Sequence, residues 1–113
     1  MSKKLKNYTE EFQFEEGPLV VRTMGCPMAI ADGEHMFAKM RGKITEPTII
    51  FLICNVVEWH EIISRKKCLD LKEAYPDHKL FITGCVNEEI GKKFESYGTL
   101  VYRQDMWNPE SYK

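Results

Sequence analysis

The chain has 113 residues, the length of one ordinary domain, and can build one hydrophobic core but not two. Hydrophobic residues make up 43% of the chain and charged residues 29%, a balance that is typical of a folded globular protein and excludes a disordered one. The formal net charge of −1 excludes a strong attraction of the whole molecule to nucleic acid or to an acidic membrane.

The N-terminal residues are basic, but no apolar segment follows them, so they do not read as a secretory signal. The longest strongly apolar run, Thr48 to Cys54, is far shorter than the roughly 20 residues that a membrane-spanning helix needs. We therefore expect a cytoplasmic chain that is neither exported nor embedded in a membrane. In a reducing cytoplasm, the four cysteines are expected to be thiols or metal ligands rather than disulfides.

The pattern of apolar residues predicts strands that alternate with helices. Residues 104–113 show no periodicity. In chain order, the predicted elements are an edge strand at Phe12–Glu15, a buried strand at Leu19–Thr23, a helix at Ala29–Met40 closed by Gly42, a strand at Thr48–Ile53 that is apolar on both faces, a long helix at Glu58–Tyr75 ended by Pro76, a strand at Lys79–Thr83, a helix at Glu88–Tyr97 and a strand at Thr99–Tyr102.

Strand–helix alternation over short connections predicts βαβ crossovers. We therefore expect a single α/β domain with three layers and a mostly parallel sheet, of the Rossmann or flavodoxin type. Its core is expected between about residues 19 and 103, with tails at residues 1–11 and 104–113. The apolar residues of the second tail, Met106, Trp107 and Tyr112, are expected to pack over the edge of their own sheet, with a contact to a partner as the alternative.

Three cysteines share one position in this pattern. Cys26, Cys54 and Cys85 each follow a predicted core strand and precede a helix. The carboxyl ends of parallel strands meet at one edge, where open α/β sheets bind ligands. A helix N-terminus also favours thiolate, the form of cysteine that binds iron or zinc. From the pattern alone, small buried residues that close three strand ends explain the cysteines equally well.

Other candidate ligands have simpler interpretations. Cys68 shares a helix face with Ile63, Leu71 and Tyr75, so we expect a packed thiol that faces the sheet. His35 and His60 fall early in helices that follow Cys26 and Cys54, and either histidine could complete a zinc shell with the three thiolates. Both are expected to be surface residues instead. Asp32 and Glu34 are interpreted as charges in the first turn of their helix.

With these residues in view, the chain resembles the N-terminal domain of the radical-SAM methylthiotransferases, which add methylthio groups to tRNA bases or to a ribosomal protein. In that family three strands run into T-x-G-C, N-T-C and T-G-C. The corresponding segments here are Thr23-Met24-Gly25-Cys26, Leu52-Ile53-Cys54 and Thr83-Gly84-Cys85. The resemblance extends from about Leu19 to Val101 and includes Asp32-Gly33-Glu34, where the family has an acidic pair.

The resemblance implies a cofactor. In the family the three cysteines hold a [4Fe–4S] cluster with one iron free of protein ligands, and that iron takes part in sulfur delivery. Carried over, Cys26, Cys54 and Cys85 would be the cluster ligands and Cys68 would not. The implied function is a cluster-binding domain that acts in sulfur transfer or tRNA methylthiolation together with a separate partner.

The sequence also departs from the family. Pro27-Met28 follows the first cysteine, where an asparagine is usual, Leu52-Ile53 replaces Asn-Thr before the second, and Val86-Asn87-Glu88 replaces Tyr-Ala-Gln after the third. No C-x-x-x-C-x-x-C motif occurs, so the chain has no S-adenosylmethionine site and is not a complete enzyme by itself. We expect a free-standing version of the domain.

The implied partners follow from this incompleteness. A separate radical-SAM enzyme or another protein would act with the chain, and tRNA would be reached only through that enzyme. Because a cluster with three cysteine ligands is partly exposed, a partner or a second copy of the chain would cover it. The alternative is an α/β interaction module that has lost the cluster or that binds zinc at the same edge.

Overall fold

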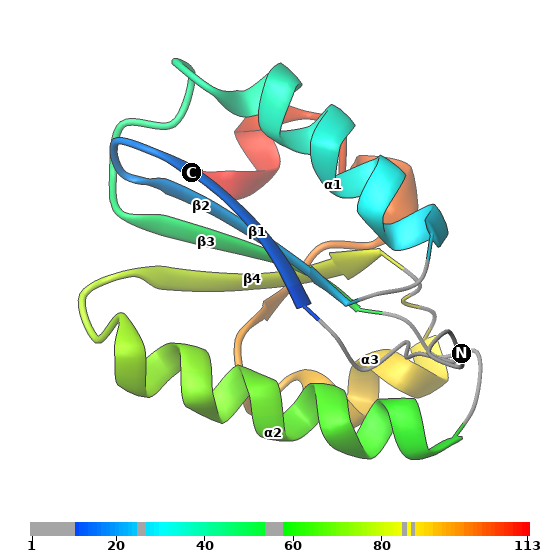
Figure 1. Cartoon of the computed structure of the whole chain (residues 1–113). Coiled ribbons are helices and arrows are strands. Elements are labelled where there is room, and N and C mark those ends of the chain that lie inside the picture. The colour runs from blue at the N-terminus through cyan, green and yellow to red at the C-terminus, as the bar shows by residue number, and fades with distance from the viewer. Residues whose placement is uncertain (1–10, 25–26, 54–57, 85, 87) are drawn as a thin grey trace, which may run out of the picture.

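The structure is a computed structural model that describes residues 11–24, 27–53, 58–84, 86 and 88–113. Within these residues the chain forms one sheet with helices on both of its faces (Figure 1). The elements are β1 (Glu11–Glu16), β2 (Leu19–Met24), α1 (Pro27–Met40), β3 (Thr48–Ile53), α2 (Glu58–Ala74), β4 (Lys79–Gly84), α3 (Glu88–Phe94), β5 (Thr99–Leu100) and the short 3₁₀ helices η2 (Arg103–Asp105) and η3 (Pro109–Tyr112).

The strands lie in the order β1-β2-β3-β4-β5. β1 pairs with β2 in the antiparallel direction, and the remaining neighbours are parallel. β3 is buried along its whole length, as its unbroken run of apolar residues predicts for a central parallel strand. The predicted α/β class with a mostly parallel sheet is therefore confirmed.

Two apolar clusters fill the space between the layers. One lies between the sheet and α2 with α3, and the other lies between the sheet and α1 with the C-terminal residues (Figure 1). Successive residues of each strand alternate between the clusters, since side chains of a strand point to opposite faces in turn. Val20, Phe51 and Ile82 thus face α2, whereas Val21 and Leu52 face α1.

The C-terminal residues belong to the core. The sequence pattern predicts a tail at residues 104–113. This prediction is wrong, because Met106 and Tyr112 are buried in the cluster on the α1 side. The Tyr112 ring meets the Phe81 ring edge-on, and its hydroxyl donates a 2.6 Å hydrogen bond to the Met106 carbonyl. Burial raises the pKa of this phenol, and the nearby Thr83 hydroxyl opposes part of the rise. The expectation that Met106 and Tyr112 pack over their own sheet is confirmed.

The crossovers on the two sides of β3 have opposite hands. β2, β3 and β4 are parallel and follow one another in the sheet, yet the chain returns through α1 on one face and through α2 on the other. Such crossovers are right-handed in about 98% of cases, so one of the two departs from the rule. Ligands in open α/β sheets bind where neighbouring strands send the chain to opposite faces. In this fold that divergence lies at the carboxyl ends of β2 and β3.

Gly33 allows α1 to lie close against β2. A Cβ atom at this position would overlap Cγ2 of Thr23, and it would lie 3.6 Å from Cε2 of Phe14. The contact is between two layers, so a larger residue at position 33 would push the helix away from the strand rather than simply fill space. The glycine inside a helix is thus explained by packing.

Gly33→Ala is expected to lower the free energy of unfolding. Overpacking of this kind costs about 1–3 kcal/mol, which exceeds the gain of up to about 1 kcal/mol that alanine brings to a helix interior. Because Thr23→Ala removes Cγ2, Gly33→Ala should cost less in a Thr23→Ala background. Chemical denaturation of the two single variants and the double variant gives this coupling. An equal cost of Gly33→Ala in both backgrounds would contradict the contact.

Candidate functional site

The candidate site lies at the carboxyl edge of the sheet, where β2, β3 and β4 end at Met24, Ile53 and Gly84. The three ends are level, because Thr23 pairs with Leu52 and Ile53 pairs with Gly84. Cys54 follows Ile53 directly in the sequence, Cys85 follows Gly84, and Cys26 comes two residues after Met24.

Cys26, Cys54 and Cys85 themselves lie outside the described residues, and so does the side chain of His60. Their assignment as ligands therefore stays a prediction. What the structure provides is the arrangement of the strands that lead to the three cysteines: neighbouring, parallel and ending at one edge.

Gly84 shapes the end of β4. Its φ of 96° lies in the region that favours glycine, and a Cβ atom would lie 2.9 Å from the carbonyl oxygen of Ile53. The Val86 amide donates a 2.9 Å hydrogen bond to the Gly84 carbonyl, so the chain turns sharply as soon as the strand ends. Glycine before the third cysteine is thus required by the backbone.

One row of side chains crosses the sheet just before this edge. Thr23, Leu52 and Thr83 are neighbours in register on three adjacent strands, and all three are buried. They share the face that packs on α1, since alternate residues of each strand lie there. The hydroxyls of Thr23 and Thr83 have no hydrogen-bond partner among the described residues. The row therefore places two unsatisfied hydroxyls next to the strand ends.

A cavity of about 440 Å³ opens beside the same edge, behind the end of β4. Its polar lining includes Glu88 at the start of α3 and the side chain of Arg103. The Arg103 guanidinium also pairs with Asp32 at 3.1 Å, which ties the C-terminal segment to α1. The complete lining is Val86, Glu88, Tyr102, Arg103 and Gln104.

The interpretation of Asp32 and Glu34 as first-turn charges is wrong. α1 begins at Pro27 and has no acidic residue in its first turn. Asp32 lies in the second turn, where it meets Arg103 from the C-terminal segment, and Glu34 is exposed. The sequence pattern gave no sign of this contact because it joins residues that are far apart along the chain.

His35 is placed away from the strand ends. It is the ninth residue of α1, which puts it about 12 Å along the helix from Pro27. Its side chain is exposed, and its ring meets the ring of Trp107 edge-on with centroids 4.8 Å apart. The expectation of a surface histidine is confirmed. Within the described part of the chain, no group of three His, Cys, Asp or Glu residues could hold a metal ion.

Cys68 lies in the core, as the helix pattern predicts. Its side chain is fully buried in the cluster between α2 and the sheet, together with Leu71 and against Ile63 and Tyr75. Burial raises the pKa of this thiol from 9.0 to about 12, although the charge of Lys72 acts in the opposite direction. A thiol that stays protonated in the core has neither the charge nor the access that a metal ligand needs.

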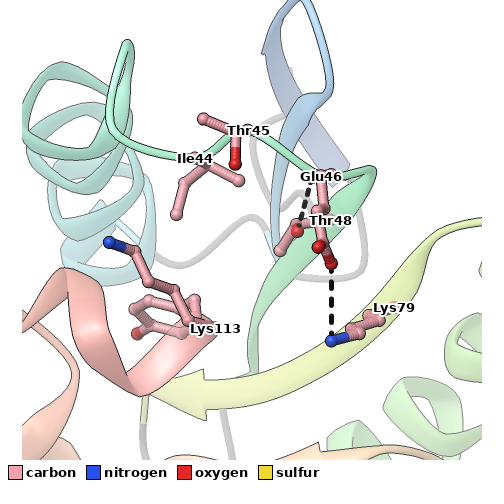
Figure 2. Close-up of a pocket in the computed structure, with 7 residues that line it drawn as sticks. Ile44, Thr45, Glu46, Thr48, Lys79 and Lys113 are labelled. Carbon is pink, nitrogen blue, oxygen red and sulfur yellow. Dashed lines mark hydrogen bonds and ion pairs between the residues drawn. The ribbon is translucent and has the colours of Figure 1, made fainter.

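A second cavity, of about 240 Å³, lies at the opposite edge of the sheet (Figure 2). Thr48 and Lys79, the first residues of β3 and β4, line it together with Glu46. The Thr48 hydroxyl donates to the Glu46 carbonyl at 2.8 Å, and the Glu46 carboxylate pairs with Lys79 at 3.7 Å. Its other lining residues are Ile44, Thr45, Tyr112 and Lys113. This cavity is at the amino edge, remote from the strand ends that precede the cysteines.

Comparison of the chain with protein-family models, with curated proteins and with solved structures finds no match. The resemblance to the methylthiotransferase domain therefore depends on the sequence motifs described above. Among the described helices, none has both the length and the apolar character needed to cross a bilayer.

The shifted Cys68 thiol leads to a prediction about alkaline stability. The pKa of this thiol is higher in the folded state than in the unfolded state. The contribution of the protonated thiol to the free energy of unfolding is therefore complete below pH 9 and is lost as the pH rises toward 12. The free energy of unfolding of the wild type should therefore fall more steeply over this range than that of Cys68→Ala, by at most about 1.4 kcal/mol per pH unit. Denaturant titrations at several pH values measure the difference, in which the other titrating groups cancel. Parallel curves would contradict the assignment.

Proposed function

We propose that the carboxyl edge of the sheet binds a [4Fe–4S] cluster through Cys26, Cys54 and Cys85. The chain would then be a cytoplasmic iron–sulfur module that acts in sulfur transfer or tRNA methylthiolation with a separate partner enzyme. The observation that carries the proposal is the common end point of β2, β3 and β4, three neighbouring parallel strands that each lead into one of these cysteines.

The spacing of the strands fits a shared ligand. Neighbouring strands of a sheet lie about 4.8 Å apart, and consecutive Cα atoms are about 3.8 Å apart. Ile53 and Gly84 are direct register partners, and each immediately precedes a cysteine. The third strand end, at Met24, is level with them on the other side of β3. Three thiolates from adjacent strand ends supply three of the four ligands that a cubane cluster takes.

Two features of the backbone leave room for a bulky group at this edge. The turn at Gly84 carries the backbone sharply away from the end of β4. The divergence of the chain to α1 and α2 occurs at the ends of β2 and β3, the usual position of ligands in sheets of this type. When bound there, the cluster would supply an iron without a protein ligand, at which a sulfur group could be held.

A zinc site at the same edge is the alternative, and it requires a fourth ligand. Of the two histidines considered, His35 is exposed on α1 and contacts Trp107. Its position about 12 Å along the helix from Pro27 does not suit a shell built around the strand ends. This observation disfavours His35 as the fourth zinc ligand, whereas the side chain of His60 lies outside the described residues and stays a candidate for that role.

Anaerobic purification tests the proposal. The wild-type chain is expected to carry about four irons and as much sulfide, because three cysteines hold one cubane cluster. Cys26→Ala, Cys54→Ala and Cys85→Ala should each lose most of the iron, since each removes one of only three protein ligands. Iron and sulfide analysis together with absorption and EPR spectra measure the loading.

Cys68→Ala is the matched control, because it removes the cysteine that lies in the core and should leave the iron content unchanged. A colourless wild-type protein that also resists reconstitution with iron and sulfide would overturn the cluster proposal. Zinc at one ion per chain, lost in the same three variants, would establish the alternative instead.

A further inference from the structure

β1 forms an open edge of the sheet (Figure 1). It has six residues, and among the described strands its only neighbour is β2. The opposite edge is much shorter, because β5 has two residues and the chain continues from it into η2. The outward backbone groups of an edge strand can pair with a further strand, and a long edge is the usual place for such pairing.

The face of this edge toward α1 is apolar and partly open to solvent. Phe12 is 38% exposed, and it shares the α1 face with Phe14, since alternate residues of a strand point to the same side. Phe14 and Phe37 of α1 are half-buried, and their ring centroids lie 5.9 Å apart. Apolar side chains of an added strand would bury these aromatic rings further.

The other face of β1 is held in place and carries a negative charge. The Gln13 amide donates to the Tyr75 hydroxyl at 2.9 Å, and the Gln13 side-chain oxygen accepts a 2.6 Å hydrogen bond from Arg22. Glu15 lies on this same face, where its carboxylate accepts from the Gln13 amide at 3.3 Å. Glu15 is exposed and forms no ion pair with another described residue. An added strand would therefore meet a preformed backbone and a carboxylate that favours a cation.

The charge of β1 selects among the possible occupants of this edge. The strand reads Glu-Phe-Gln-Phe-Glu-Glu, with three acidic residues and no basic one. Pairing of β1 with the same strand of a second copy would bring like charges together, which destabilises cross-strand pairs. An acidic edge rejects such strands and attracts basic ones, so charge complementarity favours a basic occupant.

We propose that β1 binds an extended segment of a partner protein in which apolar residues alternate with lysine or arginine. The segment adds a strand to the sheet, with apolar side chains beside Phe12 and Phe14 and a basic side chain beside Glu15. Phe12 pairs with Thr23 near the end of β2, so the bound segment reaches the carboxyl edge of the sheet. The inference does not depend on the proposed cluster, because it uses only the residues of this edge.

A short synthetic peptide of alternating valine and lysine tests the inference with the full chain in its iron-free form. Binding of the labelled peptide, followed by fluorescence anisotropy, should slow hydrogen exchange and shift NMR signals in β1. Phe12→Ala and Glu15→Lys should each weaken binding severalfold. Glu15→Lys should also bind a peptide with glutamate in place of lysine more tightly than the wild type does. Because both side chains are exposed, the variants are expected to fold.

Glu95→Lys is the matched control, because it makes the same change in charge at an exposed residue just beyond α3, and α3 lies against β5 at the opposite edge. It should leave the affinity unchanged. A peptide of equal charge with a central proline lacks a main-chain donor and should not bind.

Three results would overturn the inference: no binding to the wild type, equal binding of the proline peptide, or equal weakening by Glu15→Lys and Glu95→Lys. A wild-type chain that sediments as a dimer and becomes a monomer in Phe12→Lys would assign this edge to a second copy and would overturn it as well.

Discussion

The parallel register of β2, β3 and β4 is the constraint on which the other features of this molecule depend. Each strand is six residues long, and the partners Thr23, Leu52 and Thr83 lie in one row across the three strands. Parallel strands with equal ends bring residues far apart in sequence to one line. A shift of one residue in any strand would turn its side chains to the other face. The register thereby sets both the packing of the two clusters and the place where the cysteine segments begin.

The two faces of the sheet pack against different helices and differ in the polar groups that they bury. The cluster beneath α2 contains only apolar side chains, apart from the thiol of Cys68, which burial keeps protonated. The cluster beneath α1 is also apolar, but its carboxyl end carries two threonines whose hydroxyls are unsatisfied. Of the three buried hydroxyls that have no hydrogen-bond partner among the described residues, two thus lie next to the carboxyl edge, and the third, that of Ser64, lies on α2.

Much of this fold follows from local patterns. The apolar run Thr48–Ile53 identifies the central strand, and the helix face shared by Cys68 and Leu71 identifies a packed thiol; both agree with the structure. The opposite hands of the two crossovers could not be predicted, because each connection alone is expected to be right-handed. The contact of Asp32 with Arg103 was equally hidden, since it depends on how the C-terminal segment packs against α1. Periodicity reports which face a residue occupies and not which distant element covers it.

For the candidate site as well, the sequence pattern predicts only part of what the structure shows. The sequence marks Cys26, Cys54 and Cys85 by their position after strands and places Thr23 in a family motif, yet it does not indicate that the Thr23 hydroxyl is buried without a partner. Only the three-dimensional packing reveals a hydroxyl that is buried without a partner next to the strand ends. Such a group is a net cost to the isolated chain and becomes favourable when an acceptor arrives. The unsatisfied hydroxyls are therefore a property of the packing, although Thr23 and Thr83 also belong to the motifs on which the family resemblance depends.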